Sequence, residues 1–279
     1  MSQVFGYICS DDSLTGVVMG QEGEPLRAIG PDERVGLGVG YLQDGRSLLR
    51  KHPKRKAASV DIPSLLGDIP SRSLVGHVRH SEQGSAGTKQ LQPFRFRNWV
   101  YAQSGGSQGL EDTYDSLRAS VPDHVRRNIK GTTMAELIFH IFVTNVGPDL
   151  TKTPRSERPE LFARKLAQTM VQLQQSNSDN GDNGLGSVQA VAVTDRCIVA
   201  TRIGGSLHYR LVEGIEEPEE EPLFAGHKPK TIVHDRFRAL LVANQIDDDR
   251  WEEIPDHSVM WVDRDWEIHV DEISVATGA

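Results

Sequence analysis

The sequence predicts an α+β fold in which helices pack on two β-sheets, and three observations predict it. Within residues 3–103, short apolar stretches are bounded by glycine and other turn residues, which is the pattern of strands. Within residues 110–175, apolar residues recur at three- and four-residue spacing, as in amphipathic helices. Strand patterns return after residue 186. Because a helix block separates two strand blocks, we expect two sheets with helices packed on them.

The elements follow in order along the chain. The first block predicts strands at 3–9, 35–42, 73–80 and 98–103. The middle block predicts helices at 110–121, 123–129, 134–146 and 159–175, and the last is the clearest because proline stands at its start. The second block predicts strands within 187–202, 206–212, 238–245, 258–265 and 266–270.

Two polar segments interrupt these patterns. Residues 176–186 are rich in serine, asparagine and glycine, and residues 213–230 contain an acidic run. Such compositions are too polar to pack, so both segments are expected to be flexible loops. No clear interdomain linker is present, and residues 2–279 are predicted to form a single domain.

Composition excludes several classes of protein. The chain has 279 residues, 37% of them hydrophobic, which is enough for a large core. Apolar runs stay well below the roughly 18 residues of a membrane helix, so no membrane association is expected. A net charge of -8 argues against nucleic acid as a partner, and the basic cluster at 52–56 is predicted to be a solvated loop.

The two cysteines, Cys9 and Cys197, stand in apolar stretches and have no metal or redox spacing. The sequence also lacks a secretory signal pattern. These features predict buried, reduced thiols in a cytoplasmic protein.

Six segments carry a more specific pattern through their order. They are 1–12 (MSQVFGYICSDD), 35–41 (VGLGVGY), 74–84 (LVGHVRHSEQG), 90–106 (QLQPFRFRNWVYAQSGG), 131–136 (GTTMAE) and 240–265 (LLVANQIDDDRWEEIPDHSVMWVDRD). Through them the chain resembles the class II glutamine amidotransferase family, in the compact form of bacterial stand-alone amidohydrolases such as those of ergothioneine biosynthesis. The resemblance runs almost end to end. It implies a four-layer αββα sandwich of two stacked, mainly antiparallel sheets flanked by helices, an N-terminal nucleophile hydrolase fold.

The resemblance also implies a chemistry. In the family, an amino-terminal cysteine, exposed by removal of the initiator methionine, attacks the side-chain amide of glutamine or a γ-glutamyl compound. The α-amino group of the same residue serves as the base. An asparagine side chain and a backbone N–H stabilise the oxyanion. An arginine pairs with the substrate carboxylate, and an aspartate holds the substrate ammonium group.

When these catalytic and binding roles are assigned to the matching positions of this chain, several of the required side chains are missing. Ser2 stands at the position of the nucleophile, and a hydroxyl is a poorer nucleophile than a partly ionised thiol. Ser104 and Gly105 stand at the oxyanion position, where Ser104 replaces the asparagine. Gln103 replaces the histidine before it. Arg79 keeps the place of the carboxylate-binding arginine.

The remaining substrate positions have changed more strongly. Met134 replaces the aspartate and offers an ammonium group neither charge nor a strong acceptor. Glu82 replaces a threonine and brings a like charge close to the place of the substrate carboxylate. Further family positions are occupied by neutral residues: Val35, Leu37, Gln92, Asn244 and Gln245.

These changes favour a catalytically inactive binding or regulatory module over an enzyme, with a protein partner or a small carboxylate as its ligand. The alternative is an active amidohydrolase, with Ser2 as nucleophile, its amine as base, Ser104 and the Gly105 N–H as oxyanion donors and Arg79 as anchor. A third hypothesis, a partner that supplies ammonia to a synthase, is weaker because the chain contains no synthase domain. Self-association is left open.

No metal or cofactor is predicted. His77 and His80 flank Arg79, but the sequence offers no third ligand at a suitable spacing. Because side chains alternate along a strand, His77 and Arg79 are expected on one face of the sheet and His80 on the other.

Overall fold

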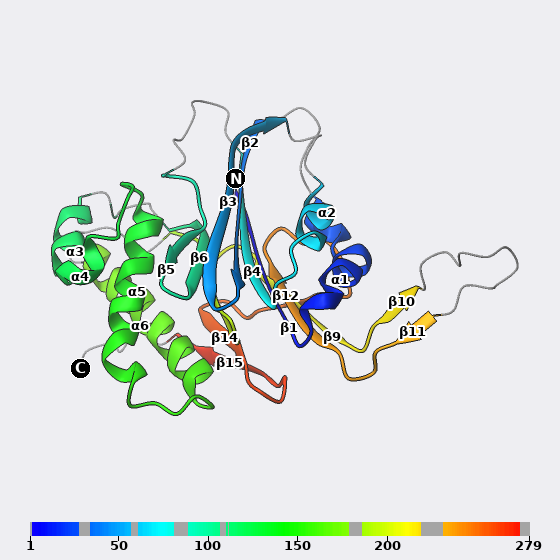
Figure 1. Ribbon diagram of the computed structural model, residues 1–279. Helices are drawn as coiled ribbons and strands as arrows, with labels where there is room; N and C mark the ends of the chain where they lie inside the picture. The colour runs from blue at the N-terminus through cyan, green and yellow to red at the C-terminus, as the bar shows by residue number, and fades with distance from the viewer. Residues whose placement is uncertain are drawn as a thin grey trace, which may run out of the picture.

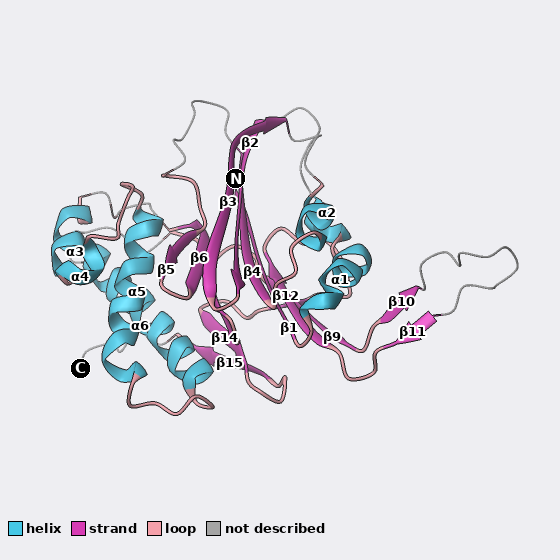
Figure 2. Ribbon diagram, viewed as in Figure 1, coloured by secondary structure: helices cyan, strands magenta, loops and turns pink. Residues whose placement is uncertain are grey.

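The computed structural model describes residues 2–27, 34–56, 61–80, 89–106, 110, 112–178, 186–218 and 231–273. In this part of the chain, two sheets lie face to face and helices cover both outer surfaces (Figures 1 and 2). The predicted four-layer αββα arrangement is therefore confirmed.

The first sheet has seven antiparallel strands in the order β13-β9-β12-β1-β4-β2-β3. The strands are β1 (Ser2–Cys9), β2 (Arg34–Gln43), β3 (Arg46–Lys56), β4 (Ser73–His80), β9 (His208–Glu213), β12 (Arg238–Ala243) and β13 (Glu252–Glu253). β1 lies in the middle and pairs with β12 on one side and β4 on the other. The residues that begin the described chain are therefore held in a central strand.

The second sheet has six strands in the order β15-β14-β8-β7-β6-β5. They are β5 (Phe94–Phe96), β6 (Trp99–Gly105), β7 (Val188–Thr194), β8 (Cys197–Ile203), β14 (Ser258–Val262) and β15 (Ile268–Glu272). Every pairing in it is antiparallel. β6, which carries Ser104 and Gly105, pairs with β7 over its whole second half.

Alternation along the strands explains why both faces of each sheet are buried. In β1, Val4 and Ile8 join the core between the sheets, whereas Phe5 and Tyr7 join the core under the helices. Gly6 points toward the opposite sheet, and a Cβ at this position would lie 2.5 Å from Cγ1 of Val191. A glycine is thus required where these two sheets pack closely.

The helices form the two outer layers. α1 (Thr15–Glu22) and α2 (Ile62–Gly67) cover the first sheet, with short 3-10 turns at Asp12–Leu14 and Glu24–Arg27. α5 (Met134–Leu150) and α6 (Arg158–Ser178) cover the second sheet, with α3 (Tyr114–Ser120) and α4 (Asp123–Arg126) packed beside α5. Among the described residues, no helix combines the length and apolarity needed to cross a membrane.

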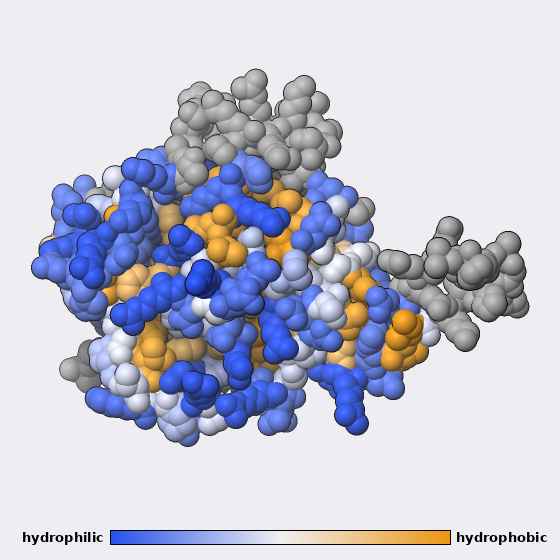
Figure 3. Space-filling model, viewed as in Figure 1, coloured by the Kyte–Doolittle hydropathy of each residue, from blue (hydrophilic) through white to orange (hydrophobic). Residues whose placement is uncertain are grey.

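A small two-stranded arm, β10 (Glu216–Pro218) with β11 (Thr231–Val233), extends from the first sheet (Figure 1). Ile232 and Val233 on this arm are exposed, and an apolar area on the arm is visible in Figure 3.

Three predicted loop regions differ from the structure. Residues 52–56 are not a loop but the end of β3, because the backbone of β2 takes its hydrogen-bond partners from them. An edge strand accepts lysine and proline, which hid the strand pattern. The predicted loop at 176–186 starts within α6, which ends at Ser178, and the one at 213–230 includes β10. Residues 179–185 and 219–230 lie outside the described residues.

Candidate functional site

The amino-terminal end of β1 borders a cavity of about 790 Å³, which we call the Ser2 cavity. Six of the predicted site residues line it: Ser2, Arg79, Gln103, Ser104, Gly105 and Met134. They come from β1, β4, β6 and the start of α5, so the fold gathers positions that are far apart in the sequence. Glu82 lies outside the described residues.

Strand register brings Ser2 and Arg79 together. The two residues are directly opposite each other in the β1–β4 pair, so their side chains share one face of the sheet. His77, two residues before Arg79, lines the same cavity, as the alternation predicted. Arg79 is exposed and forms no ion pair with any described residue. Its guanidinium group is therefore available to a ligand.

The hydroxyl groups of Ser2 and Ser104 are bonded to each other. Oγ of Ser104 lies 3.0 Å from the Ser2 carbonyl oxygen and donates to it. Oγ of Ser2 lies 2.9 Å from Oγ of Ser104. A hydroxyl carries one proton, so the Ser2 hydroxyl is the donor in this second bond. In this arrangement Ser104 has no proton left for an oxyanion.

Two amide side chains fix the start of β1. Asn244 and Gln245 each donate to the Ser2 carbonyl oxygen, with N···O distances of 3.1 Å. Asn244 also accepts the backbone N–H of Val4 through Oδ1, at 2.8 Å. The sequence comparison treated both residues only as replacements. No local sequence signal marks their role, because Asn244 and Ser2 are 242 positions apart in the chain.

The turn that ends β6 requires glycine. Gly105 has a φ of +75°, and a Cβ there would lie 1.8 Å from the Ser187 carbonyl oxygen. Gln103 supports this turn, because Nε2 donates to the Gly105 carbonyl at 2.8 Å and Oε1 accepts the Tyr101 hydroxyl at 2.5 Å. The Gln103 backbone N–H and C=O pair with the Gln92 side chain. Gln103 thus lines the cavity while its polar atoms bind the protein itself.

The start of α5 forms another wall. Thr133 caps the helix by accepting the Glu136 N–H at 3.3 Å, and the Glu136 carboxylate accepts the N–H groups of Lys130 and Gly131. Met134, the first helical residue, is buried at the cavity wall. The cap at the start of α5 is therefore complete, while Met134 presents an uncharged thioether to the cavity.

The Ser2 cavity has few charged groups in its described lining. Arg79 is its one permanently charged side chain among the described lining residues, which include no aspartate or glutamate. Most other polar groups in the lining are neutral amides and hydroxyls. Such a surface suits a ligand with one anionic group and an uncharged remainder.

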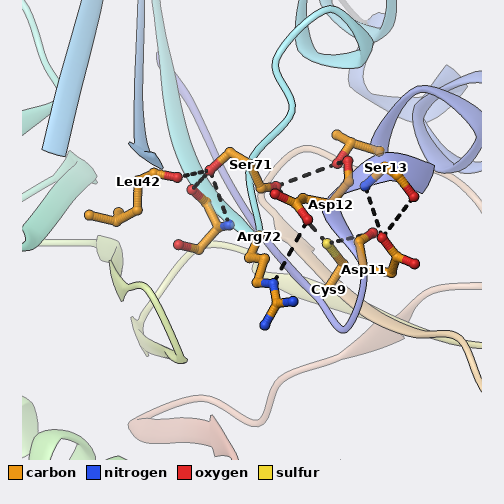
Figure 4. Close-up of polar contacts among 9 residues, drawn as sticks. Cys9, Asp11, Asp12, Ser13, Leu42, Ser71 and Arg72 are labelled. Atoms are coloured by element: carbon orange, nitrogen blue, oxygen red, sulfur yellow. Dashed lines mark hydrogen bonds and ion pairs between the residues drawn. The ribbon is translucent and has the colours of Figure 1, made fainter. Parts of the chain in front are cut away.

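Neither cysteine offers a substitute nucleophile. Cys9 lies at the opposite end of β1 from Ser2, and its Sγ donates to the Asp11 carbonyl at 3.3 Å (Figure 4). Burial raises the pKa of the Cys9 thiol to about 11. Burial also raises the pKa of Cys197. Both thiols are buried, as predicted, and stay protonated near neutral pH.

A separate group of potential metal ligands, Asp263, Glu267 and His269, does not line the Ser2 cavity. Oδ1 of Asp263 accepts the N–H groups of Asp265 and Glu267, and Oδ2 lies 2.9 Å from Nε2 of His269. These bonds account for the cluster as a turn motif.

Solved structures share this fold. A class II glutamine amidotransferase domain protein from Silicibacter pomeroyi has a TM-score of 0.58 at 13% identity, over 98% of this chain and 99% of that chain. A predicted glutamine amidotransferase from Pseudomonas aeruginosa has a TM-score of 0.51 at 12% identity, over 95% and 98%. The predicted resemblance is therefore confirmed at the level of the fold.

A third similar structure is the glutamine phosphoribosylpyrophosphate amidotransferase of B. subtilis, with a TM-score of 0.56 at 12% identity. The likeness covers 98% of this chain but 49% of that one, so the chain spans about half the length of this enzyme. No protein-family model and no curated protein sequence matches the chain.

Proposed function

We propose that this chain is a class II glutamine amidotransferase-like module that binds a small carboxylate and does not hydrolyse amides. One observation carries the proposal: the Arg79 guanidinium, which forms no ion pair with a described residue, lines the same cavity as two serine hydroxyls that are bonded to each other. The cavity can thus attract an anion, while the hydroxyl protons at the catalytic positions are already used in hydrogen bonds within the protein.

Two of these positions, Ser2 and Ser104, are unsuited to catalysis. A serine nucleophile needs a base to remove its proton, and the Ser2 proton is directed at Ser104. Ser104 in turn donates to the Ser2 carbonyl, which removes the side-chain donor of an oxyanion hole. Loss of one such donor costs about a hundredfold to a thousandfold in rate.

The same cavity defines the class of ligand. Arg79 can pair with a carboxylate through two N–H groups. A free ammonium group would find the Met134 thioether at the family's aspartate position, and the described lining offers it no carboxylate. The favoured ligand is therefore a monocarboxylate with an uncharged remainder, such as an N-acylated amino acid with a neutral side chain, rather than an amino acid with a free ammonium group.

Calorimetric titration with N-acetylglutamine and with glutamine tests this directly. N-acetylglutamine is expected to bind, and glutamine at least about tenfold more weakly, since a buried unpaired charge is costly. Arg79→Gln is expected to weaken the binding of N-acetylglutamine about tenfold or more. Arg95→Gln is a matched control that leaves it intact, because Arg95 does not line the Ser2 cavity. Tighter binding of glutamine, or binding that Arg79→Gln leaves unchanged, would contradict the proposal.

A second candidate, an amidohydrolase that uses Ser2, is favoured by one observation: Ser2, Gly105 and Arg79 line one open cavity. It requires a free amine on Ser2. Intact mass measurement of the purified protein checks that requirement, because a retained Met1 blocks the amine and excludes the mechanism.

A further inference from the structure

A second and larger cavity, of about 1360 Å³, lies where β3 and β5 approach the start of α5. Lys51 and six further cationic residues line it: Arg46, Lys89, Arg95, Arg97, Arg127 and Lys130. Glu136 is the single carboxylate among its described lining residues. We call this cavity the basic cleft.

The cations of the basic cleft have no counterions among the described residues. None of the seven forms an ion pair with a described carboxylate. The Glu136 carboxylate is occupied by the backbone N–H groups of Lys130 and Gly131, at 2.8 and 2.7 Å. Clustered like charges repel one another, and this occurs in a protein whose net charge is -8. A bound anion would relieve the repulsion.

Several of these side chains are held in place by the protein. The Lys51 ammonium is half-buried and lies over the Phe94 ring, 5.4 Å from its centroid. The Arg97 guanidinium lies over Phe96 at the same distance, and Arg95 donates from Nη1 to the Ser47 carbonyl at 2.6 Å. Cations positioned in advance lose less conformational entropy when a ligand binds.

An apolar pocket of about 390 Å³ adjoins the basic cleft. The two share Phe96, Arg97, Asn98 and His124 in their linings. The remaining wall of the smaller pocket is mainly apolar and includes Trp99, Val125, Val143, Val146 and Leu150. Figure 3 shows hydrophilic residues beside apolar ones over the region where β3, β5 and α5 meet. A single ligand can therefore reach cations with one end and apolar side chains with the other.

We propose that the basic cleft binds an organic di- or triphosphate, with the phosphates among Lys51 and its neighbouring cations and the organic group in the apolar pocket. Seven cations exceed what one carboxylate or one phosphate requires, which favours a polyphosphate. A nucleoside or an isoprenoid chain would each supply the organic group. The inference is independent of the function proposed for the Ser2 cavity.

Isothermal titration calorimetry with three probes tests the proposal: inorganic pyrophosphate, ATP and geranyl diphosphate. Binding of at least one organic probe, tighter than that of pyrophosphate, is expected, and the tighter of the two identifies the organic group. Lys51→Gln, Arg97→Gln and Arg127→Gln are each expected to weaken binding about tenfold, the effect of losing one charge-assisted hydrogen bond. Arg236→Gln, an exposed cation on the β11–β12 connection, is the matched control and should bind like the unmodified protein.

A second measurement covers the case of a variant that fails to fold. In the unmodified protein, saturating ATP or geranyl diphosphate should protect Lys51, Lys89 and Lys130 from acetylation, while the exposed Lys152, which lines neither cavity, stays reactive. Absence of binding by all three probes would overturn the proposal. The proposal would also be overturned if the three glutamine variants bound the organic probes as tightly as the unmodified protein does. A further titration with a single-stranded oligonucleotide would overturn it if the oligonucleotide bound and neither organic probe did.

Discussion

The linings of the Ser2 cavity and the basic cleft draw on the same two stretches of chain, yet the two cavities differ sharply in charge. Residues 89–94 and the first turn of α5 contribute to both, with Met134 in one lining and Glu136 in the other. The described lining of the Ser2 cavity contains one permanent charge, whereas the basic cleft contains seven cations. A fold shared with known amidotransferases therefore does not determine where this chain concentrates its chemistry.

The two regions also differ in construction. The Ser2 cavity is formed by positions with strict backbone requirements, such as the Gly105 turn and the amide clamp on Ser2. The basic cleft is formed largely by exposed side chains of long cationic residues. Substitutions around the Ser2 cavity should therefore reduce stability, whereas substitutions in the basic cleft should mainly reduce ligand affinity.

The largest effect is expected for Gly105→Ala. The positive φ and the close Ser187 carbonyl leave no room for a Cβ, so the free energy of unfolding should fall by about 2 to 4 kcal/mol. Urea denaturation measures the change. The control is Gly147→Ala within α5, where a Cβ meets no atom within 4 Å. That control should gain about 0.5 to 1 kcal/mol, and a similar loss in both variants would contradict the interpretation.

Asn244→Ala comes next. It removes the side-chain acceptor of the Val4 N–H and one of three donors to the Ser2 carbonyl, which should cost about 1 to 3 kcal/mol. Asn98→Ala, at an exposed position in the basic cleft, should change stability by less than about 0.5 kcal/mol. Equal effects in thermal unfolding would show that the clamp contributes no stability.

The sequence predicted the fold well and the site in part. Ser2, Arg79 and Ser104 line one cavity, and the order of the motifs along the chain had grouped them. Strand register and strand order depend on apolar alternation and glycine turns, and both of these are visible in the sequence. The clamp by Asn244 and Gln245 was missed, since a side-chain contact across 242 positions has no local pattern.

The basic cleft was missed for a related reason. Its cations come from β3, β5 and the segments before α5, and each group alone resembles a solvated surface. The edge strand β3 was itself hidden by lysine, arginine and proline, whose pattern is that of a loop. The three-dimensional arrangement of these segments is needed to show that the charges line one cavity.

Separate ligand effects sharpen the comparison further. Arg79→Gln should reduce the affinity for N-acetylglutamine about tenfold or more and leave the binding of organic diphosphates unchanged. Lys51→Gln should do the reverse, because each residue lines a single one of the two cavities. Calorimetry on both variants measures both affinities. A loss of both ligands in either variant would show that the two cavities are not independent.

The smallest effect is a dependence on pH. Burial lowers the pKa of Lys51 to about 8. The Glu136 carboxylate opposes this shift, and the Arg95 guanidinium adds to it. The other ionisable side chains near the phosphates include Lys89, Arg127 and Lys130, which line the same cleft. Between pH 7.5 and 9.5 Lys51 loses its charge, while the phosphates of ATP stay ionised because their second pKa is about 6. Affinity for ATP should therefore fall several-fold over this range. In Lys51→Gln the dependence should disappear, and an unchanged pH profile in that variant would assign it to another group.

The account depends most on the claim that the chain keeps the frame of an amidotransferase domain without its hydrolytic chemistry. The direct measurement is the release of ammonia from glutamine or asparagine, and of glutamate from γ-glutamyl peptides, when each is incubated with the purified protein. The account predicts no release above that of buffer. Turnover that Ser2→Ala abolishes would contradict it and establish Ser2 as a working nucleophile.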